Sequence, residues 1–472
     1  MLKSGLKIFF TFMFTFIVAF FIAAAAFTFS FLNICAPANV LAAGMTAVKN
    51  KQPAPFELSK PLNLIKAYEF ALKRNHGYKA SLYGKKASDD LAWEGLSVLL
   101  PRINVSFNYS RYDFVNPPPY YLSYDARNTS VSLTQPIFNM RRFFMYGQYK
   151  ARASIGNARF ESQKQNLIIT VARAYLDVLT GQDYVKALKS QKKAVSSELK
   201  QAQKLYGAGA GTITDVYDAR AKYYSVLSQL VGAKNDLKNA YAKFKNATGA
   251  SGRNLVPFKR NIPFFVPRPS NVKYWVKVGA RHNPMLKYYR DNRSYYTEGE
   301  RKNIAAHFPT VSFVAGYSAT NTQEYIQTPP LKYYNIGFQI SIPLFNGGYG
   351  YAKTFKDANL ESRAQQKYLG ELNKNGRKIR QSYSNIKGSI VKIKMLELAL
   401  KSARISLKEN ELGFKSGIAT ETDVLDAVQA LYDAKVKLLK AKYEYALGIL
   451  NFYFNVGVLS KYNLAKINGW LK

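Results

Sequence analysis

The sequence is poor in the side chains on which most enzyme and metal chemistry depends. Its 472 residues include one cysteine, Cys35, and three histidines, His76, His282 and His307. A single cysteine excludes an intrachain disulfide framework and any cluster of cysteines around a metal ion. Three scattered histidines leave little for a zinc site or a catalytic histidine. The composition therefore argues against an enzyme, and we predict neither a cofactor nor a bound metal.

Acidic residues are also scarce, at 29 Asp and Glu against 68 Lys and Arg, which leaves a formal net charge of +39. An excess of this size first suggests nucleic acid or an anionic membrane surface as a partner. Aromatic residues, however, make up 14% of the chain, which is too much apolar surface for a disordered basic tail. A basic, folded nucleic-acid-binding protein is thus one hypothesis, and it predicts salt-sensitive binding.

Residues 1–43 have the pattern of an export signal. Two lysines precede an uncharged stretch over residues 8–34, and residues 40–43 end in small side chains suited to signal peptidase. The uncharged stretch is long enough to span a bilayer, so a retained membrane anchor is the alternative. Lipid modification of Cys35 is disfavoured because a bulky isoleucine precedes it. Export to the cell envelope counts against a nucleic-acid partner.

The most informative feature is an internal duplication. Residues 209–219 read GAGTITDVYDA and residues 417–427 read GIATETDVLDA, with seven of eleven positions identical at a shift of 208. Repeats of this kind indicate duplicated structural units. We therefore predict two copies of one unit, at residues 44–250 and 271–472, joined by a proline-rich connector at residues 251–270.

Each copy shows the same order of expected elements. Strict alternation of apolar and polar residues, as at residues 103–110, predicts two strands per copy. Proline-free stretches predict long helices, and the helix after each repeated motif has a seven-residue apolar seam typical of a coiled coil. Gly249 and Gly457 follow these seams as expected helix ends. The expected helices cover residues 63–99, 144–206 and 219–244 in the first copy and 271–306, 351–415 and 427–452 in the second.

Four strands per chain cannot close a membrane barrel, because single-chain barrels begin at about eight strands. A small soluble sheet is one interpretation. Against it, each strand has about the ten residues that span a bilayer when tilted. Three chains would give twelve strands and a closed barrel without exposed edges, and two chains a tighter eight-stranded alternative. The expected fold is mainly α, with a membrane β-barrel completed by oligomerisation.

The exported chain resembles the TolC-like outer-membrane efflux proteins. The resemblance rests on the duplicated strand pairs, on the strand-to-helix junctions Gln135–Phe138 and Ile342–Phe345, and on the two repeated motifs. It implies a homotrimer with a 12-stranded barrel in the outer membrane and antiparallel coiled-coil helices that form an α-barrel across the periplasm. The implied role is the exit duct of a tripartite efflux pump or a type I secretion system.

The resemblance also implies partners. These are a periplasmic adaptor (a membrane fusion protein), an inner-membrane transporter of the RND, ABC or MFS type, and outer-membrane lipids, with no nucleic acid. The alternative function is a non-channel coiled-coil scaffold of the periplasm or envelope. Heat-modifiable migration on unboiled gels and outer-membrane fractionation separate the two hypotheses, because a scaffold predicts neither.

Each repeated motif lies between two long helices and is predicted to form a hairpin turn. A glycine permits the backbone conformation that ends one helix. A threonine can cap the next helix, with an aspartate three residues later in capping-box spacing. These residues are Gly209, Thr212 and Asp215 in the first copy and Gly417, Thr420 and Asp423 in the second. Asp218 and Asp426 follow on the same helix face and are not needed for capping.

By resemblance, the two turns form the periplasmic mouth of the duct. Asp423 and Asp426 are expected to line its narrowest ring as a selectivity gate, with Asp215, Asp218 and Thr214 beside them. Carboxylates gathered from three chains would favour cations, and their mutual repulsion would raise some of their pKa values. The adaptor is expected to dock at the helical turns that contain Gly209, Thr212, Gly417, Thr420 and Thr422.

One departure from the family pattern concerns how the mouth is closed. Some members hold it shut with a tyrosine and an arginine, at positions that correspond here to Phe414 and Ala419. Neither side chain can make those hydrogen bonds, although Thr214 and Asp215, the usual partners, are present. We therefore expect a closed state that is looser or that is held by other contacts.

Overall fold

The computed structural model describes residues 61–115, 123–259, 262–322 and 331–471. The predicted export signal lies outside these residues. The described residues belong to one compact unit that includes both copies of the repeat. None of the described helices is both long enough and apolar enough to cross a membrane.

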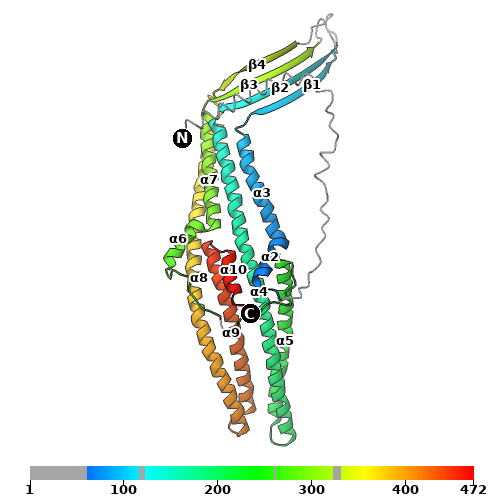
Figure 1. Ribbon diagram of the computed structural model, residues 1–472, viewed down its shortest axis with the longest axis vertical. Helices are drawn as coiled ribbons and strands as arrows, with labels where there is room; N and C mark the ends of the chain where they lie inside the picture. Colours follow the sequence, from blue (N-terminus) through cyan, green and yellow to red (C-terminus); the bar gives the residue numbers. More distant parts are fainter. Residues whose placement is uncertain (1–60, 116–122, 260–261, 323–330, 472) are drawn as a thin grey trace. The chain divides into compact units, whose positions relative to one another are not determined.

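Each copy contains, in order, two short helices, two strands and two long helices (Figure 1). The first copy consists of α2 (Leu64–Arg74), α3 (His76–Ser97), β1 (Arg102–Tyr112), β2 (Tyr124–Phe138), α4 (Met140–Gly207) and α5 (Ile213–Thr248). The second consists of α6 (Val272–His282), α7 (Pro284–Ile304), β3 (Thr310–Thr322), β4 (Leu331–Ser341), α8 (Tyr349–Lys415) and α9 (Glu421–Val456). The second copy adds a 3₁₀ turn, η2 (Ala305–His307), and a final helix, α10 (Lys461–Asn468). The predicted strands and long helices are confirmed.

The first helix predicted in each copy was wrong in one respect, because the structure divides it into two. An asparagine at the break caps the helix that follows through its side-chain oxygen. Its amide also donates to the end of a long helix, from Asn75 to the Ala247 carbonyl (3.0 Å) and from Asn283 to the Asn455 carbonyl (2.8 Å). Asparagine competes with helical backbone bonds in this way, so the duplicated break is built by the same hydrogen bonds in both copies.

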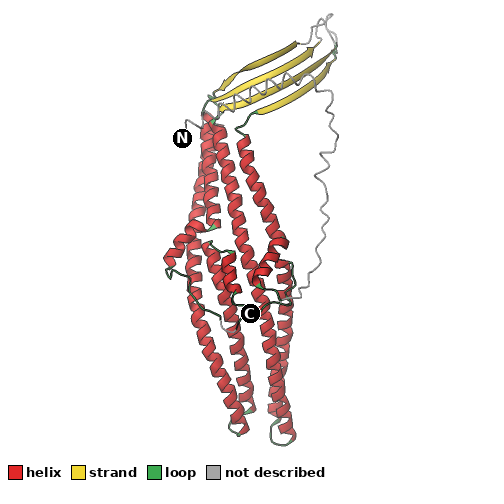
Figure 2. Cartoon of the chain, viewed as in Figure 1, coloured by secondary structure: helices red, strands yellow, loops and turns green. Residues whose placement is uncertain are grey.

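The four strands form one antiparallel sheet in the order β1-β2-β3-β4 (Figure 2). The register places Ile103 beside Leu133, Leu133 beside Ala315, and Ala315 beside Ile336, so these side chains share one apolar face. That face is open: Phe107 and the other apolar residues of β1 and β4 are mostly more than half exposed. Among the described elements, the strands make their extensive contacts only with one another. Within the described residues, the sheet therefore has an uncovered apolar face and two open edges.

The hydrophobic core joins the two copies. Tyr175 of α4, Phe244 of α5 and Phe452 of α9 are completely buried in a single cluster. The hydroxyl of Tyr175 donates to the Val256 carbonyl (2.8 Å) in the predicted connector. Trp470, after α10, packs in the same cluster. The connector and the C-terminal segment thus belong to the core, which fixes the two long helical hairpins to each other.

The predicted coiled-coil seams are buried, most completely in the first copy. In α5, Ala219, Val226, Leu230 and Ala233 are each at most 5% exposed. In α9 the corresponding Leu438 is also buried, as are most seam residues nearer the C-terminus of that helix. Seven-residue spacing keeps one helix face toward its partner, so each hairpin is held by side chains that the sequence pattern identifies.

Gly249→Ala and Gly457→Ala form a matched pair of tests at the ends of α5 and α9. Both glycines have a left-handed φ, +72° and +85°, which costs an alanine about 1–2 kcal/mol. At Gly457 the added Cβ would also overlap the backbone of Asn283, whereas at Gly249 it meets the flexible side chain of Arg74. We expect Gly457→Ala to lower the free energy of unfolding by about 2 kcal/mol more than Gly249→Ala. Urea unfolding followed by circular dichroism measures both, and equal losses would contradict the packing argument.

Candidate functional site at the hairpin tips

The first hairpin tip joins α4 to α5. Gly209 has φ +74° and donates its N–H to the Tyr206 carbonyl (3.0 Å), which ends α4. Thr212 then begins α5 with a complete capping box. Its hydroxyl accepts from the Asp215 N–H (3.2 Å), and its own N–H donates to the Asp215 carboxylate (3.0 Å). The predicted turn and cap are confirmed here.

The second hairpin tip repeats this geometry between α8 and α9. Gly417 has φ +79° and donates to the Phe414 carbonyl (3.1 Å). Thr420 accepts from the Asp423 N–H (3.2 Å), and the Thr420 N–H and hydroxyl both donate to the Asp423 carboxylate (2.8 and 2.6 Å). Asp423 therefore has a structural role within its own chain, in addition to any role in a ring of carboxylates.

The bonds from Thr420 lower the pKa of the Asp423 carboxyl group. A lowered carboxyl pKa stabilises the folded tip above the ordinary value for aspartate, near 3.9, and this contribution is lost as the pH falls through the lower folded value. The upward shift expected from like charges requires neighbouring chains. Within one chain, the cap shifts the pKa of Asp423 downward.

Asp426 makes the contact that connects the two tips. Lys222 of α5 donates to the Asp426 carboxylate (3.0 Å) and to the side-chain oxygen of Gln429 (3.0 Å). Asp426 keeps 65% of its side chain exposed and Lys222 keeps 38%, so solvent screens this ion pair. Asp218 and Thr214 are likewise exposed, on the first tip. A lysine–aspartate contact thus joins the two tips.

Apolar contacts also hold the two tips together. Leu425 and Val428 of α9 are each 1% exposed, and they pack in one cluster with Val195 of α4 and Val216 of α5. The start of α9 is therefore inserted against the first hairpin. Any movement of the second tip away from the first would expose these side chains to water.

Glu421, the first residue of α9, belongs to the second tip but was not predicted from the sequence. The side chain is only 4% exposed, and neither carboxyl oxygen has a hydrogen-bond partner among the described residues. Burial, together with the negative charges of Glu198 and Asp215, raises the pKa of Glu421 to about 7. An acidic residue at a helix start ordinarily complements the helix dipole, so a glutamate at this position does not by itself indicate a buried carboxyl group. The available signal was the repeat itself, because Ile213 is the equivalent residue in the first copy.

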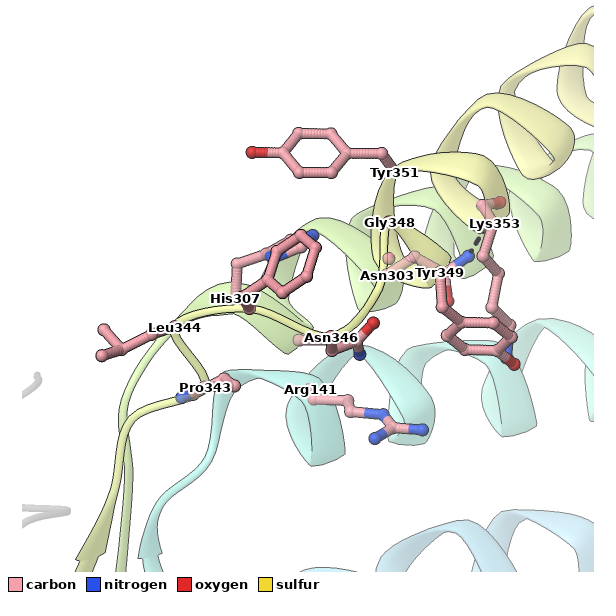
Figure 3. A pocket seen from close by; sticks show the side chains of 13 residues that line it. Arg141, Asn303, His307, Pro343, Leu344, Asn346, Gly348, Tyr349, Tyr351 and Lys353 are labelled. Carbon is pink, nitrogen blue, oxygen red and sulfur yellow. Dashed lines mark hydrogen bonds between the residues drawn. The ribbon is translucent and has the colours of Figure 1, made fainter.

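A separate hollow lies where the second strand pair meets α8 (Figure 3). Arg141, Asn303, His307 and Lys353 are among the residues that line it. The ring of His307 lies against Gly350 so closely that a Cβ there would overlap it. The described residues contain no group of three His, Cys, Asp or Glu side chains placed to bind a metal ion. We interpret the hollow as packing at the strand-to-helix junction.

Thr420→Ala tests whether the capping box holds the start of α9. Removing the hydroxyl frees the Asp423 N–H, and we expect that amide to exchange its hydrogen about tenfold faster, in line with the usual loss on removing a helix cap. Thr422→Ala is the matched control, because it removes the same group from the same turn outside the box. Hydrogen exchange read by mass spectrometry compares them, and identical exchange in both variants would contradict the assigned cap.

Comparison with known proteins places this architecture in a family. The model for the family described as outer membrane efflux protein matches residues 69–250 and 283–452. Outer membrane protein TolC of Escherichia coli K12 is 29% identical over 427 residues, covering 88% of this chain and 86% of TolC. Alkaline protease secretion protein AprF of Pseudomonas aeruginosa is 26% identical over 423 residues, covering 85% of this chain and 86% of AprF.

A solved structure shows the same fold. The Campylobacter jejuni CmeC outer membrane channel superposes with a TM-score of 0.74 at 17% identity, covering 88% of this chain and 94% of CmeC. The two matched segments of the family model coincide with the two structural copies, and each includes one strand pair and one long hairpin. The duplicated sequence, the open sheet and these matches show that the chain belongs to the outer membrane efflux protein family, whose members are transport ducts and not enzymes.

Proposed function

We propose that three copies of this chain form an exit duct through the outer membrane and periplasm. The observation that carries the proposal is the sheet, whose apolar face is uncovered and whose edge strands β1 and β4 are unpaired within the described chain. In a bilayer every backbone polar group must be paired, so strands span it only as a closed barrel. Three four-stranded sheets supply the twelve strands of such a barrel.

The long helices support the same assembly. Exposed apolar residues recur every seven positions on α5, where Tyr217, Tyr224 and Val231 are 55–60% exposed. They recur at the same spacing on α8. The α8 residues are Val391, Leu398, Ile405 and Leu412, each 49–59% exposed. Apolar stripes of this period are the seams of coiled coils. We infer that the stripes of adjacent chains pack together and extend the barrel as a helical tube.

The duct requires partners that supply its substrate. A periplasmic adaptor would dock at the helical turns of the two tips, where Gly209, Thr212, Gly417, Thr420 and Thr422 lie at the surface or half-buried. An inner-membrane transporter of the RND, ABC or MFS type would complete the pump. Relatives include a TolC protein and a protein of alkaline protease secretion, and the family is that of outer membrane efflux proteins, so both efflux and type I secretion suit this chain.

The tips would act as the gate of the duct. Asp423 and Asp426 from three chains would form a ring of six carboxylates, which attracts cations and blocks the resting channel. The Lys222–Asp426 contact and the apolar packing of Leu425 hold the tips together. They take the place of the tyrosine and arginine latch that Phe414 and Ala419 cannot form.

Ile405→Asp tests the trimer and its barrel together. The wild-type chain should fractionate with outer membranes and migrate as a heat-modifiable trimer on unboiled gels. In the trimer, the new carboxylate would be buried in the α8 stripe without a partner, which costs about 3 kcal/mol. We therefore expect the trimer fraction to fall at least about tenfold. Ser406→Asp adds the same charge at the neighbouring exposed position outside the stripe and serves as control. A wild-type chain that is neither heat-modifiable nor in the outer membrane would support the envelope scaffold instead.

Asp423→Ala combined with Asp426→Ala tests the gate. We expect higher resting conductance in planar bilayers and weaker block by divalent cations, because both the ring of charges and the contact with Lys222 are lost. Lys222→Ala removes that contact and keeps the ring, so it should raise resting conductance without weakening the block. Lys234→Ala, at an exposed position on the same helix, is the control. Unchanged conductance and block in the double variant would remove the gate role.

A further inference from the structure

Glu421 occupies a position where a charged side chain is difficult to accommodate. It is 4% exposed at the start of α9, and both of its carboxyl oxygens lack hydrogen-bond partners within the described chain. A buried carboxylate without partners is strongly unfavourable and is avoided by taking up a proton. The equivalent residue of the first copy, Ile213, is apolar and 44% exposed. The acid is therefore peculiar to the second tip.

The charges that act on Glu421 from the neighbouring helices have the same sign as its own. Glu198 approaches from α4 and Asp215 from the start of α5. Glu411 of α8 acts in turn on Glu198, whose pKa is raised by burial and then by that charge. Asp423, on the same helix as Glu421, is already bonded by Thr420. Four helices thus bring carboxyl groups to this junction.

Lys222 of α5 does not neutralise Glu421, because its ammonium group is bonded to Asp426 and Gln429. A metal ion does not explain the site, because the described residues offer no group of three ligating side chains close enough to bind one. The positive end of the α9 dipole favours the anion. However, no backbone N–H in the described part of the chain donates to the Glu421 carboxyl group. The cost of burying the charge therefore exceeds the stabilisation by the helix dipole. The ligand that fits an isolated buried carboxyl group is a proton.

We propose that Glu421 is a proton-binding residue that controls the packing of the two hairpin tips. With the proton bound, Glu421 is neutral and α9 packs against α4 and α5. When the proton leaves to solvent, the carboxylate must reach water, and the start of α9 separates from the first tip. This inference rests on the proposed function, because the tips that separate are those assigned to the mouth of the duct.

The direction of the pH dependence follows from the raised pKa of Glu421, about 7 against an ordinary value of 4.5. The closed packing binds the proton more tightly than the open one, so it is favoured at low pH and weakened as the pH rises from 4.5 to 7. Across that interval the ratio of closed to open tips should fall on the order of 100-fold. The Asp423 cap acts in the opposite sense, but only below the ordinary aspartate pKa.

Conductance of the full chain in planar bilayers, measured from pH 5 to pH 8, tests the proposal. Resting conductance of the wild type should rise about tenfold over this range. Glu421→Gln keeps the shape of the side chain and cannot lose a proton, so its conductance should stay at the pH 5 level. Glu409→Gln, at an exposed position of α8 outside this group of carboxyls, should keep the wild-type rise. A wild-type rise that persists in Glu421→Gln would overturn the proposal.

Hydrogen exchange separates this inference from the proposed function. In the solubilised chain, amides of residues 424–428 should lose protection between pH 5 and 8, after correction for intrinsic rates, and Glu421→Gln should abolish that loss. Glu421→Ile, which introduces the residue of the first copy, should abolish it too. If the chain forms no conducting trimer, the proposed duct function is refuted. Hydrogen exchange in the solubilised chain then still tests the role of Glu421 by itself. Equal pH dependence in wild type and both variants would overturn it.

Discussion

The constraint on which the structure depends is the need to pair backbone hydrogen-bonding groups along the edges of β1 and β4. Within the described chain these edges end a sheet of only four strands, with an apolar face that no described helix covers. In water such a sheet would aggregate through its edges. Membrane insertion and assembly with further copies satisfy both requirements at once. The long helices α4 and α8 follow β2 and β4 along the chain, so both are attached to a sheet that is not stable alone.

Much of this fold could be predicted because it is periodic. Strand alternation located all four strands, and seven-residue spacing located the seams that bury Ala219 and Leu230. The break at Asn75 was missed because a lone asparagine is tolerated in a helix, and the break at Asn283 because the helix-start signal of Pro284 was overlooked. Each asparagine also makes a tertiary bond, such as the one to the Asn455 carbonyl. Local sequence pattern contains no information about that partner.

For the candidate site, too, the local motifs could be predicted from the sequence, whereas contacts between distant segments could not. Capping boxes have fixed spacing, so the roles of Thr212 and Thr420 followed from the motif itself. The contact between Lys222 and Asp426 joins residues 204 positions apart, and the burial of Glu421 depends on how the second tip packs against the first. Neither is a property of one segment. Both are visible only as differences between two copies that otherwise match.

The ion pair between Lys222 and Asp426 joins the two tips, and the residues at the duplicated positions cannot form a second such pair. In the repeat, Asp426 of the second copy corresponds to Asp218 of the first, so the acidic residue is present in both. Lys222 of the first copy corresponds to Ala430 of the second, which has no charge. In the proposed ring of six hairpins, this contact would join the two that belong to one chain. Breaking it would release the second hairpin of each chain from the first, so the aperture would widen by the outward movement of three alternate hairpins instead of all six.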